Sequence, residues 1–109
     1  MDAVVAAASK RIRLDLNSPE FQNVFFRLEQ DDLKQVVAAL RRLYELDWNS
    51  LYRRTGFRWE AIQHLTAPNG SSVHSLRLSQ RIRGLAFRDG DFLRVVSLHP
   101  DHDSAYRTS

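Results

Sequence analysis

The residues best suited to acid–base chemistry gather near the end of the chain, where His99, His102 and Tyr106 fall within eight positions. Imidazole has a reference pKa near 6.5 and can take or give a proton at neutral pH, and a tyrosine can stack on a base or hold a proton. Arginine is concentrated just before these rings, at Arg77, Arg81, Arg83 and Arg88. Because a guanidinium grips a phosphate with two parallel hydrogen bonds, this combination indicates chemistry on a phosphate-bearing substrate.

Two kinds of site could be built from such a set of residues, a metal site and a metal-free site for RNA cleavage. The His99-x-x-His102 spacing, with Asp101 and Asp103 beside it, resembles a metal site, but two histidines without a cysteine cluster are weak evidence and we expect no metal. RNA, in contrast, can be cut by its own 2′-hydroxyl when one group removes that proton and another protonates the leaving 5′-oxygen. Cations steady the extra phosphate charge, so this reaction needs only histidine, tyrosine and arginine, without a cofactor.

The charge distribution agrees with an acidic partner. The formal net charge is +3, yet the segment 53–88 holds seven arginines and one acid, Glu60. Such a concentration favours nucleic acid, or an acidic protein segment that masks the same surface. The alternative is a set of solvated arginines on the outer face of a sheet. Glu60 could act as a general base paired with Arg83 or form a cross-strand ion pair.

The elements that must position these residues can be predicted from periodicity. Alternation over 10–16 predicts a strand with Ile12, Leu14 and Leu16 on one face. Ser18 and Pro19 then mark a helix start, followed by a second helix from about Asp31 to Leu46. The apolar faces expected for the two helices are Phe21, Val24, Phe25 and Leu28, and Leu33, Val36, Val37, Leu40, Leu43 and Tyr44.

The second half of the chain predicts an antiparallel series. A connector over 47–56, anchored by Trp48, Leu51 and Tyr52, leads to strands at 57–65, 73–78, 82–88 and 92–98. Phe57, Trp59, Ala61, Gln63 and Leu65 would share one face of the first of these strands. Asp89-Gly90 is expected to form the tight turn between the last two. The register after Ser79-Gln80 stays open, and a slip of one residue would exchange the two faces.

Together these elements predict an α+β fold in which an N-terminal strand and a helical hairpin pack on a four- to five-stranded, mainly antiparallel sheet. We expect one domain over 1–109, with 1–9 as a flexible tail. Cysteine is absent, and the apolar run at 3–8 is too short for a signal peptide or a membrane span. These features favour a soluble cytoplasmic protein without a membrane partner.

The segment SLRLSQRIRGLAFRDGDFLRVVSLHPDHDSAY, preceded by Trp59-Glu60, resembles the RelE/ParE toxin superfamily over about residues 10–106. The resemblance is to the RelE-like members, ribosome-dependent messenger RNA endonucleases of toxin–antitoxin systems. It implies that Arg77 and Arg83 grip the RNA and that His99 or His102, with Tyr106, completes the catalytic site. The implied partners are the ribosome, its message and a cognate antitoxin.

Two positions depart from the RelE-like pattern. Ile82 stands where the family often has a base-stacking tyrosine, and Asp101 and Asp103 make the tail acidic where RelE-like toxins are often basic. These departures keep a second function open, a ParE-like toxin that binds DNA gyrase and cuts no RNA. A plain RNA-binding domain is a third.

Overall fold

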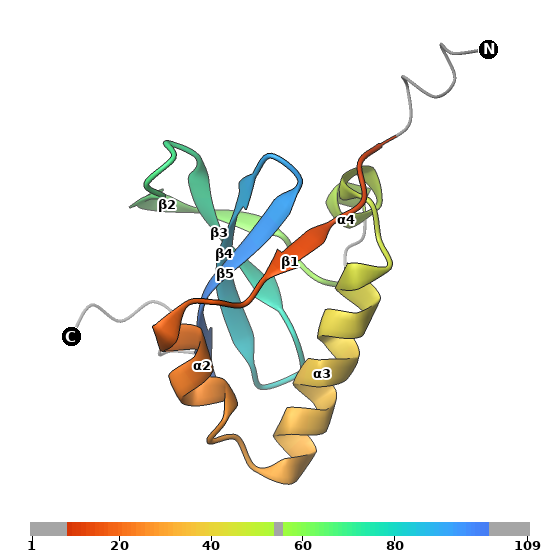
Figure 1. The fold of residues 1–109 in the computed structure, drawn as a ribbon, viewed down its shortest axis with the longest axis vertical. Coiled ribbons are helices and arrows are strands. Elements are labelled where there is room, and N and C mark those ends of the chain that lie inside the picture. Colours follow the sequence, from red (N-terminus) through yellow and green to blue (C-terminus); the bar gives the residue numbers. More distant parts are fainter. Residues whose placement is uncertain (1–8, 54–55, 101–109) are drawn as a thin grey trace.

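Five strands form one mixed sheet in the order β1-β5-β4-β3-β2 in the computed structural model, which describes residues 9–53 and 56–100. The elements are β1 (Arg13–Asp15), α2 (Pro19–Phe25), α3 (Gln30–Tyr44), α4 (Trp48–Arg53), β2 (Glu60–Thr66), β3 (Ser72–Arg77), β4 (Arg83–Asp89) and β5 (Phe92–His99). β1 runs parallel to β5, and every other neighbouring pair is antiparallel. Figure 1 shows α2 and α3 as the two arms of a hairpin. The predicted α+β fold is therefore confirmed.

The core lies between the helices and one face of the sheet. α3 contributes Val36, Ala39, Leu40 and Leu43, which are buried together with sheet residues such as Leu76, Leu93 and Leu98. Each buried leucine or valine contributes about 1.5–3 kcal/mol relative to its exposed state. Because the helices cover this face, the opposite face of the sheet remains available to a substrate.

The predicted start of the first helix is confirmed. Ser18 is the N-cap of α2, where its hydroxyl accepts a hydrogen bond from the Phe21 backbone N–H at 3.4 Å, and Pro19 is the first helical residue. The same hydroxyl donates to the Val96 carbonyl at 2.6 Å. One serine thus caps α2 and attaches it to β5.

The second helix is also confirmed, but its buried face is narrower than predicted. Val37 and Tyr44 are 39% and 61% exposed, whereas Ala39 is fully buried. Residues at 36, 39, 40 and 43 line one side of a 3.6-residue repeat, and 37 and 44 fall on its flank. A helix that touches the core along one stripe leaves the flank in solvent.

The first strand is shorter than predicted. Arg13–Asp15 pairs with β5, whereas Lys10 to Ile12 turn toward the connector: Trp48 N–H bonds to the Lys10 carbonyl and Ile12 N–H to the Leu46 carbonyl. The segment 10–16 therefore pairs with β5 in its second half and with the connector in its first half, so it does not form one continuous strand. Ile12 is buried as expected, while Leu14 and Leu16 are half-buried.

The region 47–66 differs most from its prediction. The connector contains α4, which buries Trp48 and Leu51 but leaves Tyr52 51% exposed. The strand predicted over 57–65 begins only at Glu60. Ala61, Gln63 and Leu65, which the sequence places on one face, are exposed.

The geometry of this edge strand explains why these residues do not share one buried face. Arg58 and His64 have positive φ angles of 51° and 74°, and the pairing with β3 shifts register between Ala61 and Thr66. Each irregularity turns the side chains that follow, so simple alternation cannot persist. Phe57, at the start of the predicted strand, is nevertheless buried.

The last three strands fall within one residue of their predicted ends, but the hairpin turn lies one residue later than predicted. Asp89 pairs with Phe92, so the two central residues are Gly90 and Asp91. Gly90 has a φ of 63° and Asp91 stays on the negative side, which is the pattern of a type II′ turn with glycine first.

Among the described residues, no helix combines the length and apolar character that crossing a membrane requires.

Candidate active site on the sheet face away from the helices

The register of the sheet brings three of the predicted site residues into one line. Arg77 of β3 pairs with Arg83 of β4, and Arg83 pairs with His99 of β5. Residues directly opposite each other in an antiparallel pair point to the same face, with Cβ atoms about 4.5–5.5 Å apart. We refer to Arg77, Arg83 and His99 as the Arg–His row.

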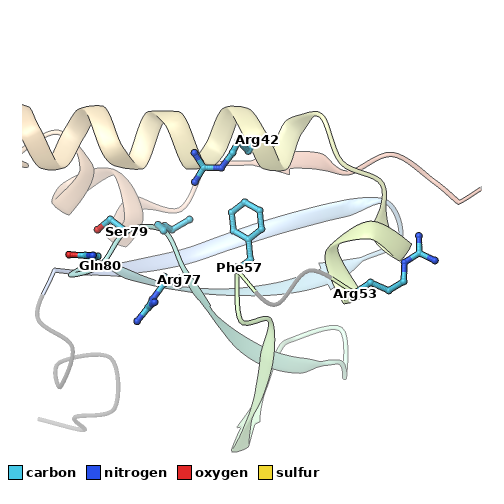
Figure 2. A pocket seen from close by; sticks show the side chains of 8 residues that line it. Arg42, Arg53, Phe57, Arg77, Ser79 and Gln80 are labelled. Atoms are coloured by element: carbon cyan, nitrogen blue, oxygen red, sulfur yellow. The ribbon is translucent and has the colours of Figure 1, made fainter.

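The row faces away from α3. Its neighbouring row, Leu76, Gly84 and Leu98, is buried, and a Cβ added to Gly84 would lie 3.1 Å from Leu76 Cδ2. Because successive residues of a strand alternate between faces, Arg77, Arg83 and His99 project to the opposite side. Figure 2 shows Arg77 pointing away from the helix.

The charges of the row would favour a bound anion. Like charges directly opposite each other on neighbouring strands destabilise a sheet, and Arg77 and Arg83 are such a pair. The Arg77 Nε is also buried without a hydrogen-bond partner among the described residues. An anion over the row would offset the repulsion, and a phosphate offers oxygen acceptors for both guanidinium groups.

His99 supplies a titratable ring at the end of the row. Its Nε2 lies 2.8 Å from the Ser97 hydroxyl, which holds the ring in place. Burial lowers the pKa of His99 below its ordinary value of 6.5, and the nearby Glu20 carboxylate partly opposes this shift. A histidine that is neutral at physiological pH can accept a proton as a general base.

Glu60 lies in the next row on the same face. It pairs with Ser75, which pairs with Leu85 and through it with Ser97. This register places Glu60 diagonal to Arg77, with both β3 and β4 between it and His99. The pairing of Glu60 with Arg83 that the sequence allowed is not formed, because β3 lies between their strands.

The structure places the other two predicted arginines away from the row. Arg81 lies in the turn between β3 and β4 and forms a salt bridge with Asp32 at 3.3 Å. Arg88 lies at the other end of β4, where its guanidinium stacks over Trp48 at 4.4 Å and donates to the Tyr52 hydroxyl at 2.7 Å. Both side chains have partners within the fold, so RNA bound to either arginine would have to compete with these contacts.

The remaining predicted residues, His102 and Tyr106, lie outside the described part of the chain, as do Asp101 and Asp103. β5 ends at His99. The roles of His102 and Tyr106 stay predictions.

Sequence reasoning gave no role in the site to the two serines beside the row. Ser75 and Ser97 are 3% and 8% exposed and lie on the Arg–His face, two residues before Arg77 and His99. A serine two positions before each candidate residue in a strand was the available signal. Ser97 contacts His99 directly, so it belongs to the site.

Comparisons with known proteins support the fold. No protein-family model and no curated protein matches the sequence. A crystal structure of a copper-bound mutant toxin from Helicobacter pylori is similar, with a TM-score of 0.50 and 17% identity. The alignment covers 87% of this chain and 99% of the toxin chain. At this identity the likeness establishes a shared fold with a bacterial toxin.

Proposed function

We propose that this protein is the toxin of a toxin–antitoxin pair and that it cuts messenger RNA on the ribosome. The observation that carries the proposal is the Arg–His row, in which two arginines and a histidine from three separate strands share one face. The shared fold with the Helicobacter pylori toxin supports the broader role, and the RelE-like sequence resemblance supports the reaction.

The row suits cleavage of RNA by its own 2′-hydroxyl. His99 takes the 2′-hydroxyl proton, the 2′-oxygen attacks the adjacent phosphorus, and the bond to the 5′-oxygen breaks. This leaves a 2′,3′-cyclic phosphate on one fragment. Arg77 and Arg83 hold the phosphate and stabilise the charge that grows on it in the transition state. His102 or Tyr106 is the proposed donor of the proton that the leaving 5′-oxygen needs.

The same surface is the proposed docking place of a cognate antitoxin in the cytoplasm. An acidic segment laid over Arg77 and Arg83 would neutralise both charges and exclude RNA at the same time. Arg81 precedes β4 and Arg88 lies near its end, so an antitoxin that reached beyond the row to either of them would have to compete with their contacts to Asp32 and Tyr52.

Controlled expression in bacterial cells tests the proposal. The chain should arrest growth and shorten the lifetime of translated messages, while Arg83→Gln should do neither. Arg41→Gln is the matched control, because Arg41 is exposed on α3, on the far side of the sheet from the row. Growth arrest with intact messages and DNA damage would contradict the nuclease and support the gyrase-binding alternative.

A further inference from the structure

A groove of about 520 Å³ adjoins the row at the edge of β3. Its walls come from α3, from Gly56 and Phe57, and from the residues that leave β3 toward the next strand. Its lining residues include Arg42, Phe57, Arg77, Leu78 and Gln80. The Arg77 N–H bonds to the Phe57 carbonyl at 2.6 Å, which fixes this wall against β3 where β2 no longer covers it.

The polar groups of the groove are basic or neutral. Arg42 is exposed on α3 and lies over the Phe57 ring at 5.7 Å. In Figure 2, Arg42 and Phe57 face each other across the groove, and Arg53 points away from both. None of the described residues that line the groove is acidic, and Arg42 forms no salt bridge within the described part of the chain.

The apolar floor offers little surface for a hydrophobic anchor. Phe57 is 5% exposed and Leu78 is 3% exposed, so an apolar side chain from a protein partner would bury little new area. Binding here must come from charge and hydrogen bonds. A nucleotide of an RNA strand, with a charged phosphate for Arg42 and a polar base edge for Gln80, fits these groups better than an apolar peptide anchor does.

Arg77 connects the groove to the row at the edge of β3, because it lines the groove while its side chain points away from α3, toward the face that it shares with Arg83. From this continuity we infer that the groove binds a phosphate of the RNA strand next to the one held by the row. The inference rests on the proposed function, since it takes the strand that crosses the row to continue around the edge of β3. It makes Arg42 a binding residue for the substrate, outside the reacting atoms.

The test measures fluorescence anisotropy of a labelled single-stranded RNA carrying 2′-O-methyl groups throughout, which the protein can bind but cannot cut. Arg42→Gln should weaken binding roughly 3- to 10-fold. It should also lower the slope of log affinity against log salt by about 0.7, the value for one lost contact to a single strand. Arg42→Lys keeps the charge and should keep the slope while losing part of the affinity.

Arg41→Gln is the control, since it removes the same charge from the neighbouring position of α3 outside the groove. Equal RNA binding by wild type, Arg42→Gln and Arg41→Gln would overturn the inference. So would unchanged RNA binding together with weakened binding of a labelled polyglutamate peptide, which would assign the groove to an acidic protein segment. A melting curve for each variant shows that the fold is retained.

The outcome is separable from the nuclease itself. Binding of the uncleavable RNA that depends on Arg42 would support the groove even if no message is cut. Cleavage that depends on Arg83, together with RNA binding that does not depend on Arg42, would support the proposed function and contradict the RNA-binding role of the groove.

Discussion

Arg77 and Arg83 face each other across β3 and β4, and a buried Nε of Arg77 lacks a partner among the described residues. For stability alone this arrangement is unfavourable, since directly opposed like charges cost about 0.2–1 kcal/mol. Residues held in an unfavourable state are typical of functional sites, where a ligand supplies the missing interaction. The opposed arginines of the row therefore indicate a functional site more strongly than the number of arginines in the sequence does.

The opposed charges predict opposite effects on stability and activity. Arg83→Gln should abolish message cleavage while raising the free energy of unfolding by about 0.5 kcal/mol, because it removes the repulsion of Arg77. Urea unfolding of both proteins, with cleavage measured on the same preparations, checks this. A variant that is less stable than the wild type would show that Arg83 serves the fold.

His99 predicts a pH dependence. Its pKa is lowered by burial, so the neutral base form persists below pH 6.5. Cleavage should be constant near neutral pH and fall as pH drops through that lowered pKa. His99→Gln should lose about 10²- to 10⁴-fold in rate.

The control for this prediction is His64→Asn. His64 is exposed on β2 and has a φ of 74°, which asparagine tolerates, so this variant should keep the wild-type profile. Proton NMR titration of the His99 ring gives the pKa directly, and a value above 6.5 would contradict the assignment.

At the scale of elements, Ser18 links α2 to β5 through two hydrogen bonds. Ser18→Ala removes both the cap and the bond to the Val96 carbonyl, and should lower the free energy of unfolding by about 1–2 kcal/mol. Ser18→Thr keeps a hydroxyl at the same place and should lose much less. Equal losses in chemical denaturation would show that the hydroxyl is unimportant and that the site tolerates no added methyl group.

The elements also show where sequence patterns were sufficient. Ser18-Pro19 located α2, and the 3.6-residue repeat located α3, because both signals act within one turn of helix. β3, β4 and β5 were predicted within one residue of their ends, although a register shift between Leu85 and Ala86 interrupts the pairing of β4 with β5. β2 begins at Glu60, later than the predicted start at Phe57, and no local pattern indicates the positive φ angles at Arg58 and His64 or the register shift that break its alternation.

The candidate site depends on the same distinction between local and long-range information. The sequence indicated Arg77, Arg83 and His99 singly, yet it left the register after Ser79-Gln80 open. The turn closed by the Ser79 hydroxyl, which accepts from the Arg81 and Ile82 N–H groups, sets that register. It places Arg83 opposite Arg77 and sends Arg81 toward Asp32.

For the whole molecule, the pKa directions predict two steps of acid destabilisation. Burial lowers the pKa of both His74 and His99, so the unfolded chain binds more protons and stability falls as pH drops below 6.5. Arg94, bonded to Asp15 at 2.6 Å and to Asp89 at 2.8 Å, lowers the pKa of both carboxyls. Their contribution is complete above pH 3.8 and is lost as pH falls further.

Thermal melts across the acid range check this, with Arg94→Gln as the comparison. That variant should keep the loss of stability caused by His74 and His99 as the pH drops below 6.5. It should show a much smaller loss of stability below pH 3.8. A lower step of unchanged size would show that Arg94 does not link β1, β4 and β5 electrostatically.

The most direct test of the Arg–His row as a nuclease site adds the purified protein to a translating extract and maps message ends by primer extension. Wild type should produce new ends that appear only while translation proceeds, and Arg83→Gln and His99→Gln should produce none. Arg41→Gln should match the wild type. Intact messages with the wild-type protein, or new ends that persist in both row variants, would contradict the account.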